Sequence, residues 1–455
     1  MHRRHKPMNI AKKTALTSFF LAGTLLLTSC GLGAAASSGE AAISAESVDG
    51  TDLPTGVEID FWHIQATIYG EAITEMVQEF NATNEWGIVV NESFKGSYQE
   101  LNQAVRAALA GGGAPDVSMA YENDVLEYVA NDVIVPLDSY LESDNFGVSE
   151  DDLGDLVDGV LARQRVDAYD GHTLSWPHGN SSMGLYYNAD LFAEAGIAEP
   201  PVDWDEFLAQ ARQLKETTGL AYAAMGPAKN AVFYNMLRSK GITPYDTGAA
   251  TTEFTSRESI ESLELLSQLF TEELVYTAAD TEQEFTNERT ATEIGTTART
   301  STKIDQIGDK FDWSVALTPQ ETDEPITQLF GGNHVILASA DPEQELAAWL
   351  FMRWFADTDA QSIYAARTGY SPAVKSALDT PLLSTNYQEN PQKADAFENV
   401  FVNAQIMPPT AAGNAIDDMV TGIVEEVVLG WVTPQEAAER MDAEATRLLQ
   451  SAPQN

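Results

Sequence analysis

Residues 94–122, FKGSYQELNQAVRAALAGGGAPDVSMAYE, change their hydrophobic period twice. In the middle of this stretch apolar side chains recur at three- and four-residue spacing, which predicts a helix with one buried face. These apolar positions are Leu101, Val105, Ala108 and Leu109. Three glycines at 111–113 and then Pro115 end the helix, because glycine accepts a positive φ and proline lacks the amide hydrogen that would continue it. The stretch therefore predicts a helix between two strands.

Two tyrosines and an acid follow the predicted strands. Tyr98 comes after the first strand, and Tyr121 and Glu122 end the second. In an open α/β sheet, ligands bind outside the carboxyl ends of the strands. We therefore expect these three side chains to converge on one crevice.

The alternation of strands and helices extends along the chain. Residues 57–62 alternate apolar and polar as a strand does, a helical period follows over 72–80, and 88–94 form the next strand. This order is typical of a parallel sheet with helical crossovers and predicts a first α/β lobe. The pattern restarts near Asp170 and leads to a strand over 183–188, which predicts a second lobe.

Later helices have recognisable starts. Asp203 precedes Glu206 at the spacing of a capping box, and another apolar helix runs from about residue 256 to 270. Asp341-Pro342 and Thr433-Pro434 each combine an N-cap residue with a proline at the first helical position. These signals predict helices over the C-terminal third of the chain.

Charge excludes some classes of partner. The chain carries 25 Lys and Arg against 69 Asp and Glu, a formal net charge of −44. Five of the basic residues precede residue 40, where no acid occurs, so the remainder has 20 basic against 69 acidic side chains, or −49. Such a surface repels phosphate backbones and anionic headgroups, which argues against binding of nucleic acid or peripheral attachment to a membrane.

The N-terminus has the pattern of an export signal. Basic residues up to Lys13 precede an apolar run over 15–27 that is too short to span a bilayer comfortably. Leu27-Thr28-Ser29-Cys30 resembles a bacterial lipobox, which implies a signal peptide over 1–29 and a lipid on Cys30, the only cysteine. A plain secretory signal with a chance cysteine is the alternative. With one cysteine, a disulfide and a cysteine-based metal site within the chain are excluded.

Residues 30–55 follow the leader and are rich in Gly, Ala, Ser and acids. They have no apolar period, so we expect a flexible tether between the lipid and the folded part. The expected location is extracytoplasmic, with lipid anchorage to the bacterial cell membrane.

A set of short motifs occurs in a characteristic order between residues 57 and 447. They are Phe61-Trp62-His63, Lys95-Gly96-Ser97-Tyr98, Tyr121-Glu122, Asn180-Ser181-Ser182, Gly331-Gly332 and Thr368-Gly369-Tyr370-Ser371-Pro372. The ordered set resembles the extracellular solute-binding proteins that feed ABC importers. Within them it is most similar to the carbohydrate group typified by the glycerol-3-phosphate-binding protein.

The resemblance implies a two-lobe, periplasmic-binding-protein-like fold of type II, in which each lobe is a mainly parallel sheet flanked by helices. Lobe one would comprise 56–168 and about 311–360, and lobe two 169–310 and about 361–455. The ligand would bind in the cleft between them. The implied partners are a small carbohydrate or polyol and the permease subunits of an ABC transporter, and we expect a monomer without a cofactor.

The resemblance also implies the ligand contacts. Planar side chains cover the C–H faces of a sugar and polar groups bind its hydroxyls. The family's positions correspond here to Tyr98, Glu122, Ser182, Thr296, Gly332 and Tyr370. Glu122 would accept hydrogen bonds from hydroxyls, and Gly332 would let backbone N–H groups approach the ligand.

One departure from the family bears on the ligand. In the glycerol-3-phosphate-binding type, an arginine after a Pro-Pro pair helps to bind the phosphate. Here Pro408-Pro409 is followed by no basic residue until Arg440, and the counterpart lies around 417–419. Because a phosphate without a fixed cation is costly to bury, we expect a neutral sugar, oligosaccharide or polyol. Glycerol-3-phosphate or a glycerophosphodiester is the alternative, with Arg299 or Arg367 as the substitute cation.

Several motifs that are typical of enzymes do not occur in the sequence. The six histidines form no HExxH, and neither Gly-x-Ser-x-Gly nor a phosphate-binding Gly-Lys-Ser/Thr loop occurs. A metal site is therefore not expected. Paired carboxylates suited to glycoside hydrolysis occur throughout so acidic a chain, so an extracellular glycosidase remains a rival hypothesis. A surface protein that binds a polymer without transport is a third.

Overall fold

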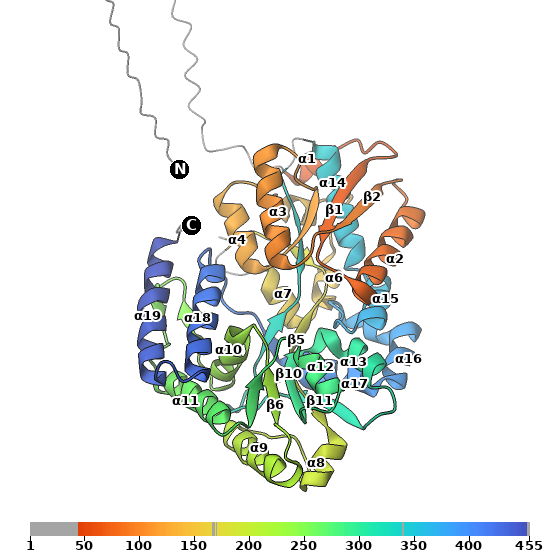
Figure 1. Ribbon diagram of the computed structural model, residues 1–455. Helices are drawn as coiled ribbons and strands as arrows, with labels where there is room; N and C mark the ends of the chain where they lie inside the picture. Colours follow the sequence, from red (N-terminus) through yellow and green to blue (C-terminus); the bar gives the residue numbers. More distant parts are fainter. Residues whose placement is uncertain (1–43, 166–168, 170, 339–340, 453–455) are drawn as a thin grey trace, which may run out of the picture. The chain divides into compact units, whose positions relative to one another are not determined.

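The computed structural model describes residues 44–165, 169, 171–338 and 341–452 (Figure 1). The expected signal peptide, Cys30 and the first part of the expected tether lie outside the described residues. None of the described helices is both long enough and apolar enough to cross a membrane.

The first sheet has the strand order β2-β1-β3-β13-β4. Its strands are β1 (Glu58–His63), β2 (Val89–Phe94), β3 (Val117–Ala120), β4 (Trp176–Pro177) and β13 (Asn333–Ile336). β1 pairs parallel with β2 and β3, whereas β13 runs antiparallel to β3 and β4. The alternation predicted for β1 is confirmed, since Ile59, Phe61 and His63 point inward.

Helices cover both faces of this sheet (Figure 1). They include α2 (Thr67–Thr83), α3 (Tyr98–Gly111), α4 (Glu122–Ala130), α7 (Asp158–Gln164), α14 (Pro342–Phe355) and α15 (Thr358–Thr368). Shorter helices are α5 (Asp138–Leu141) and α6 (Glu150–Asp155). The stop predicted for α3 is confirmed, because Gly112 caps it in the left-handed region at φ +77°. Sheet and helices share one hydrophobic core, at whose centre Trp349 is fully buried.

The second sheet is built around β5 (Ser181–Asn188), with the order β10-β5-β12-β14 and β11 also paired to β5. The other strands are β10 (Thr292–Thr296), β11 (Trp313–Leu317), β12 (Thr327–Phe330) and β14 (Ala404–Gln405). β10, β11 and β12 all run antiparallel to β5. The expectation of a mainly parallel sheet in each lobe is therefore wrong for lobe two, and both sheets are mixed.

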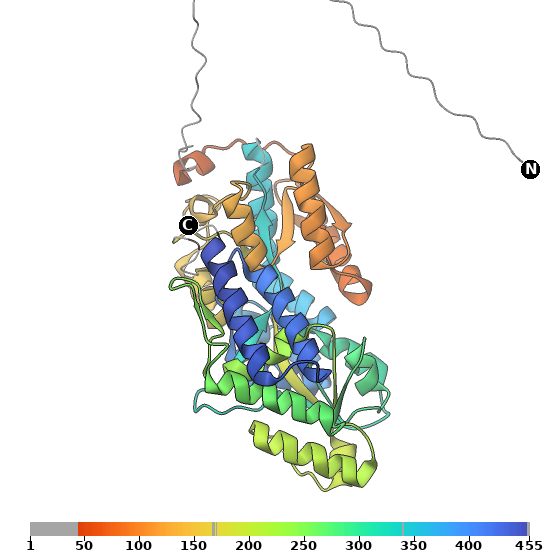
Figure 2. The same ribbon diagram turned by 60° about the vertical axis from the view of Figure 1, so that its left-hand side comes forward.

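Lobe two has its own hydrophobic core. Its larger helices are α8 (Ala189–Ala195), α9 (Trp204–Thr218), α10 (Lys229–Ser239), α11 (Arg257–Thr271), α18 (Gly413–Val428) and α19 (Pro434–Ser451). α18 and α19 lie side by side, and α11 crosses below them (Figure 2). The N-cap predicted at Thr433 is confirmed and forms a capping box, since Thr433 accepts from the Glu436 amide and Glu436 accepts from the Thr433 amide.

The remaining elements are short. They are α12 (Thr281–Thr286), α13 (Thr300–Ile307), α16 (Pro381–Glu389), α17 (Pro391–Asp395) and the paired strands β6 (Ala223–Met225) with β9 (Val275–Thr277) and β7 (Tyr245–Asp246) with β8 (Thr251–Thr252). α13 and α17 contact each other, and α16 packs on α15.

The segment of about 311–360, expected in lobe one, contributes to both sheets. β11 and β12 pair with β5, and only from Asn333 does the chain run in the first sheet as β13. β4, expected in lobe two, also belongs to the first sheet. Apolar periodicity predicts a strand but does not report which sheet it joins. The chain changes sheets three times, at 178–180, at 331–332 and between β13 and β14. The start of lobe two at about 361 is also wrong, because Tyr364 and Leu383 pack in the core of lobe one.

Part of the segment expected to be a tether is folded. Residues 45–49 form helix α1 (Ala45–Asp49), whose Val48 is buried in the core of lobe one. Asp49 accepts hydrogen bonds from the Ser143 hydroxyl at 2.5 Å and from the Asn145 amide at 3.0 Å. A flexible tether over the whole of 30–55 is therefore wrong for its last part, because one apolar side chain and one acid suffice to fix the helix.

Candidate ligand-binding site

Tyr98 and Tyr121 meet where the first sheet ends. Tyr98 begins α3 after β2, Tyr121 precedes α4 after β3, and the ring centroids are 3.8 Å apart. The convergence expected from the strand ends is therefore present. Burial raises the pKa of the Tyr98 phenol well above its usual value, so the hydroxyl stays protonated.

The hydroxyl of Tyr98 lies against Gly332. A Cβ at Gly332 would overlap the Tyr98 oxygen and come within 2.6 Å of Met119 Cε, so a larger residue there would displace the Tyr98 hydroxyl. The buried Tyr98 hydroxyl finds no hydrogen-bond partner among the residues that the structure describes. An unpaired buried hydroxyl is a group that a ligand can satisfy.

Glu122, the first residue of α4, forms an ion pair with Arg163 of α7. The same Oε1 also accepts from Asn333 Nδ2 at 2.8 Å. Arg163 is 1 % exposed in its side chain, and its other donors reach the Gly331 carbonyl and, at 3.4 Å, Asn180 Oδ1. One guanidinium thus joins Glu122 to the crossover segments at 178–180 and 331–332.

Arg163 and Asn333 were not predicted as site residues from the sequence. Arg163 lies on the same buried face of α7 as Val160, and a single arginine at that spacing resembles a surface residue. Arg163 can be identified as a site residue only because a buried charge must be compensated, and its burial is known only from the structure.

Tyr370 forms a second aromatic wall. Its ring stacks on Tyr364 at 5.5 Å and meets Tyr69 edge-on at 5.9 Å, and its hydroxyl accepts from Gln65 Nε2 at 3.3 Å. Burial raises the pKa of the Tyr370 phenol, although the hydrogen bond from Gln65 opposes this. A Cβ at Gly179 would lie 3.1 Å from the Tyr370 ring, so the first crossover passes directly over it.

A pair of buried histidines lies behind this wall. His178 Nδ1 is 2.9 Å from His334 Nε2, and His178 Nε2 is 3.1 Å from the Tyr364 hydroxyl. Burial, reinforced by the charge of His63, lowers the pKa of His334 to about 3. Burial also lowers the pKa of His178 well below its usual value, so both rings are neutral at neutral pH.

Ser182 and Thr296 lie on adjacent strands of lobe two. Ser182 is fully buried, and its amide donates to Thr297 Oγ1 at 2.9 Å. Thr296 donates to Ser181 Oγ at 3.0 Å. Phe330, directly before the Gly331-Gly332 crossover, pairs in register with Ser181.

Thr296 lines a cavity of about 710 Å³ between the start of α2 and lobe two. Thr67 and Ile68 contribute from α2, and acidic side chains and Arg299 from the other side. Arg299 lies 3.9 Å from Glu282 and over the Tyr69 ring. The cation of this cavity is therefore already opposed by a carboxylate.

The other positions considered for a phosphate-binding cation supply none. Arg367 is bound at 2.9 Å to Glu75 on the surface. The region of α18 expected to correspond to the family's arginine carries Asp417, and burial raises the pKa of this carboxyl to about 6.

The six positions expected to bind the ligand are thus linked, directly or through other residues, by contacts. Tyr98, Glu122 and Gly332 are brought together directly. Arg163 and the crossovers connect them to Ser182 and Thr296, and Gly179 connects them to Tyr370. Ser182 differs from the expectation in one respect, since its hydroxyl is enclosed by protein, 3.5 Å from Thr297 Oγ1.

This architecture of two mixed α/β sheets, joined by crossovers beside a polar and aromatic site, is that of a binding protein. Residues 75–395 match the family model of the bacterial extracellular solute-binding proteins, and the chain belongs to this family. The family binds solutes and does not consist of enzymes, so the glycosidase hypothesis is set aside.

Individual relatives are distant but cover most of the chain. The sn-glycerol-3-phosphate-binding periplasmic protein UgpB of Escherichia coli (strain K12) is 26% identical over 412 residues, which cover 86% of this chain and 92% of that protein. The structure of UgpB from Mycobacterium tuberculosis in complex with glycerophosphocholine superposes with a TM-score of 0.76 at 20% identity, covering 86% of this chain and 98% of that one. The cyclic alpha-maltosyl-1,6-maltose binding protein from Arthrobacter globiformis gives 0.74 at 21% identity, with coverages of 87% and 100%. These structural likenesses confirm the two-lobe fold.

Replacing Arg163 tests whether its guanidinium holds the site together. Arg163→Met leaves Glu122 buried without its cation, which we expect to cost about 3–5 kcal/mol of unfolding free energy in urea titrations. Arg212→Met is the matched control, because Arg212 makes a two-point ion pair with Glu272 on the exposed surface. Equal losses in the two variants would contradict the account.

The histidine pair predicts a pH dependence of stability. Because the folded-state pKa of His334 lies near 3, below that of an unfolded histidine, its stabilising effect is complete above about pH 6.5 and is lost as pH falls towards 3. Between about pH 7 and about pH 5 the unfolding free energy of the wild type should therefore fall by about 2 kcal/mol more than that of His334→Gln.

Val335→Ala is the control for this comparison, since it removes fully buried volume from the same strand without a titrating group. It should lower stability equally at both pH values. Wild type and His334→Gln with the same pH slope would show that His334 titrates normally. Comparing variants is necessary because a buried acid such as Asp417, whose raised pKa has the opposite sign, also contributes to the wild-type curve.

Proposed function

We propose that this protein is the extracytoplasmic substrate-binding component of an ABC importer, and that it captures a neutral sugar, oligosaccharide or polyol. Family membership supports the solute-binding role, and relatives of the same fold are named for maltose-type saccharides and for glycerol phosphates. A lipid on Cys30 would keep the protein at the membrane beside its permease.

The proposal of a neutral ligand rests on the pairing of the cations at the site with acceptors of the protein. Arg163, the cation of the site, gives its hydrogen bonds to Glu122, Asn180 and the Gly331 carbonyl. Lys303, below the Thr296 strand, lies 3.0 Å from Glu293 and is fully buried. Of the cations discussed for this site, each within the described part of the chain, Arg163 and Lys303 contact carboxylates directly, and Arg299 faces Glu282 at 3.9 Å. A phosphate would thus enter the site at a high desolvation cost.

The acceptors and rings suit a sugar instead. Glu122 can accept from hydroxyls, and the Tyr98 hydroxyl has no partner in the described residues. The rings of Tyr98 and Tyr121 pack on each other, and that of Tyr370 packs on Tyr364, so aromatic groups surround these polar atoms. Aromatic faces and a few directed polar groups are the usual means of binding a carbohydrate.

A glycerol phosphate is the second candidate. It is favoured by the relatives whose names contain glycerol-3-phosphate and by the structural relative that holds glycerophosphocholine. Such a ligand would require Arg163 or Arg299 to exchange a carboxylate for the phosphate.

Contacts from both lobes would couple binding to closure. A ligand that touches Tyr98 and Glu122 on one lobe and Thr296 on the other binds the closed arrangement better than the open one, so it shifts the population toward closure. The permease can then distinguish the loaded from the empty protein.

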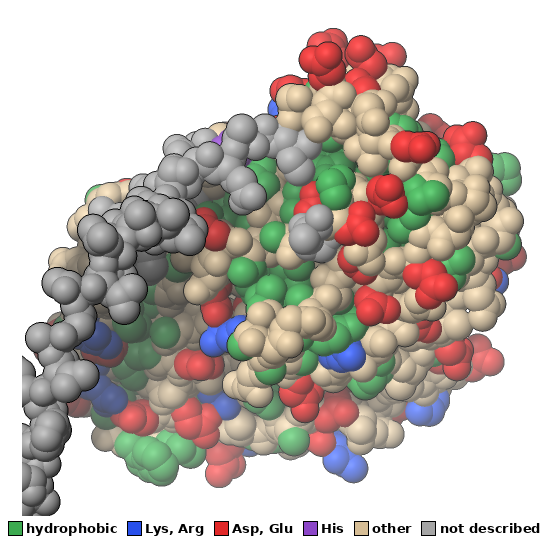
Figure 3. Space-filling model, turned by 90° about the horizontal axis from the view of Figure 1, so that it is seen from above, with side chains coloured by type: hydrophobic (Ala, Val, Ile, Leu, Met, Phe, Trp, Pro, Cys, Tyr) green, Lys and Arg blue, Asp and Glu red, His purple; other side chains and the backbone are tan. Residues whose placement is uncertain are grey.

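The acidic surface visible in Figure 3, where red side chains far outnumber blue ones, fits a protein that avoids anionic headgroups.

Calorimetry with mono- and oligosaccharides, polyols and glycerol phosphates tests the proposal. We expect at least one neutral carbohydrate to bind. Tyr98→Phe should weaken binding modestly, by roughly 2–10-fold, and Glu122→Ala strongly, by roughly 10–100-fold, because a hydrogen bond to a charged group contributes more than a neutral one.

Glu127→Ala is the matched control on the same helix, since Glu127 pairs with Arg106 at the surface. It should leave affinity unchanged. Micromolar binding of a glycerol phosphate with none of the neutral sugars would refute the neutral-ligand proposal. Unchanged affinity in both Tyr98→Phe and Glu122→Ala would remove these residues from the site.

A further inference from the structure

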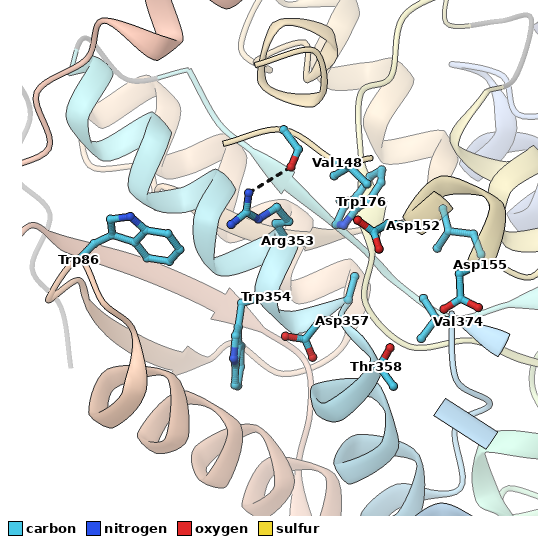
Figure 4. A pocket seen from close by; sticks show the side chains of 13 residues that line it. Trp86, Val148, Asp152, Asp155, Trp176, Arg353, Trp354, Asp357, Thr358 and Val374 are labelled. Atoms are coloured by element: carbon cyan, nitrogen blue, oxygen red, sulfur yellow. Dashed lines mark hydrogen bonds between the residues drawn. The ribbon is translucent and has the colours of Figure 1, made fainter. Parts of the chain in front are cut away.

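A second recess lies on lobe one, beside the C-terminal half of α14 (Figure 4). Its volume is about 330 Å³. We call it the tryptophan recess and define it by Trp86, Asp152, Trp176, Arg353, Trp354 and Asp357. None of the six positions expected to bind the transported ligand lines it.

Trp176 contributes an unsatisfied donor to the recess. Its side chain is buried, with the residue only 3 % exposed, yet its indole Nε1 has no acceptor among the described residues. The neighbouring Trp349 packs against it at 5.4 Å and differs in this respect, because its Nε1 donates to the Phe146 carbonyl at 2.9 Å. Leaving a buried N–H without a partner is unfavourable, so a molecule in the recess that offers an acceptor would be stabilised by this donor.

Arg353 is fixed at the centre of the recess. Its Nη1 donates to the Phe146 carbonyl at 2.7 Å and to the Gly147 carbonyl at 3.1 Å, and the guanidinium carbon lies 5.9 Å from the Trp86 ring centroid. Figure 4 shows Trp86 on one side of Arg353, and Trp176 with Asp152 on the other. The remaining guanidinium N–H groups have no hydrogen bond recorded to a described residue and can donate to a ligand.

Three carboxylates line the recess, and one of them, Asp155, is already engaged by the amide and the hydroxyl of Ser376. The other two, Asp152 and Asp357, supply further acceptors. Asp152 accepts from the Ser149 hydroxyl at 2.7 Å, and Asp357 accepts from the Ala360 amide at 2.8 Å. Each carboxylate can accept more hydrogen bonds than this. The recess therefore combines donors, acceptors and the flat rings of Trp86 and Trp354 in a small space.

This combination restricts the ligand class. An organic cation would meet the guanidinium of Arg353, and an organic anion would meet Asp152 and Asp357. A neutral polyhydroxylated ring offers both donors and acceptors, and its C–H face covers an indole ring. The volume is at the lower end of small-molecule pockets, which suits one sugar unit.

We propose that the tryptophan recess is a second saccharide-binding site, which holds a single neutral pyranose unit outside the cleft. The site uses the indole N–H of Trp176 and the guanidinium of Arg353 as donors, and Asp152 and Asp357 as acceptors. A longer glycan could then be held at the surface of lobe one independently of the cleft.

The test is a fluorine NMR titration of the full chain labelled with 5-fluorotryptophan. The eight tryptophans give separate reporters, and the signals of Trp86, Trp176 and Trp354 are assigned by single Trp→Phe replacements. The probes are methyl α-D-glucopyranoside, methyl β-D-galactopyranoside, choline and gluconate. We expect at least one pyranoside to shift the signals of Trp86 and Trp354 saturably, and the shift to persist in Glu122→Ala.

Two neighbouring variants provide the matched comparison. Asp152 and Asp151 both lie in the first turn of α6, but only Asp152 lines the recess. Asp152→Ala should weaken the pyranoside response by roughly 2–10-fold, as expected for a lost hydrogen bond, and Asp151→Ala should leave it unchanged.

Three outcomes would overturn the proposal. No shift with either pyranoside would show that the recess does not take such rings. A response to choline or gluconate alone would assign it to a charged ligand. Loss of the shift in a Glu122→Ala protein that still unfolds cooperatively would show that the signals report the cleft instead. A cleft that binds no sugar would leave this inference intact.

Discussion

The buried guanidinium of Arg163 is the constraint on which the site depends. A charge that is 1 % exposed must be compensated within the protein, and the compensation comes from Glu122, Asn180 and Gly331. These partners belong to α4 and to two crossover segments. The acceptors that this one cation requires thus fix the start of a helix of lobe one against two of the three places where the chain changes sheets.

The glycines at the crossovers are explained by the close approach of the two crossover segments. Gly331 has φ +112°, and a Cβ there would collide with the backbone of Gly179, so the two crossovers pass at backbone contact distance. Gly332 in turn gives its space to the Tyr98 hydroxyl. The Gly331-Gly332 pair therefore allows the backbones to approach closely and does not serve only as an ordinary turn. It also brings the polar end of Tyr98 into the same small region as Glu122.

The sequence predicts features that depend on neighbouring residues better than features that depend on residues far apart in the chain. Local signals were sufficient for the stop of α3 at Gly112, for the cap at Thr433 and for the strand alternation of β1. Sheet membership was not predicted, because β11 and β12 carry no mark that they pair antiparallel with β5. For the site, motif order placed Tyr98, Glu122 and Gly332 together, whereas Arg163 and Asn333 were missed since their importance arises only from burial.

Hydrogen exchange measured by mass spectrometry, with and without a saturating carbohydrate, tests the central claim that both lobes hold the ligand. The account predicts increased protection at once in the segments around Tyr98 and Glu122 on lobe one, around Thr296 on lobe two, and at the 331–332 crossover. Protection confined to one lobe would contradict it.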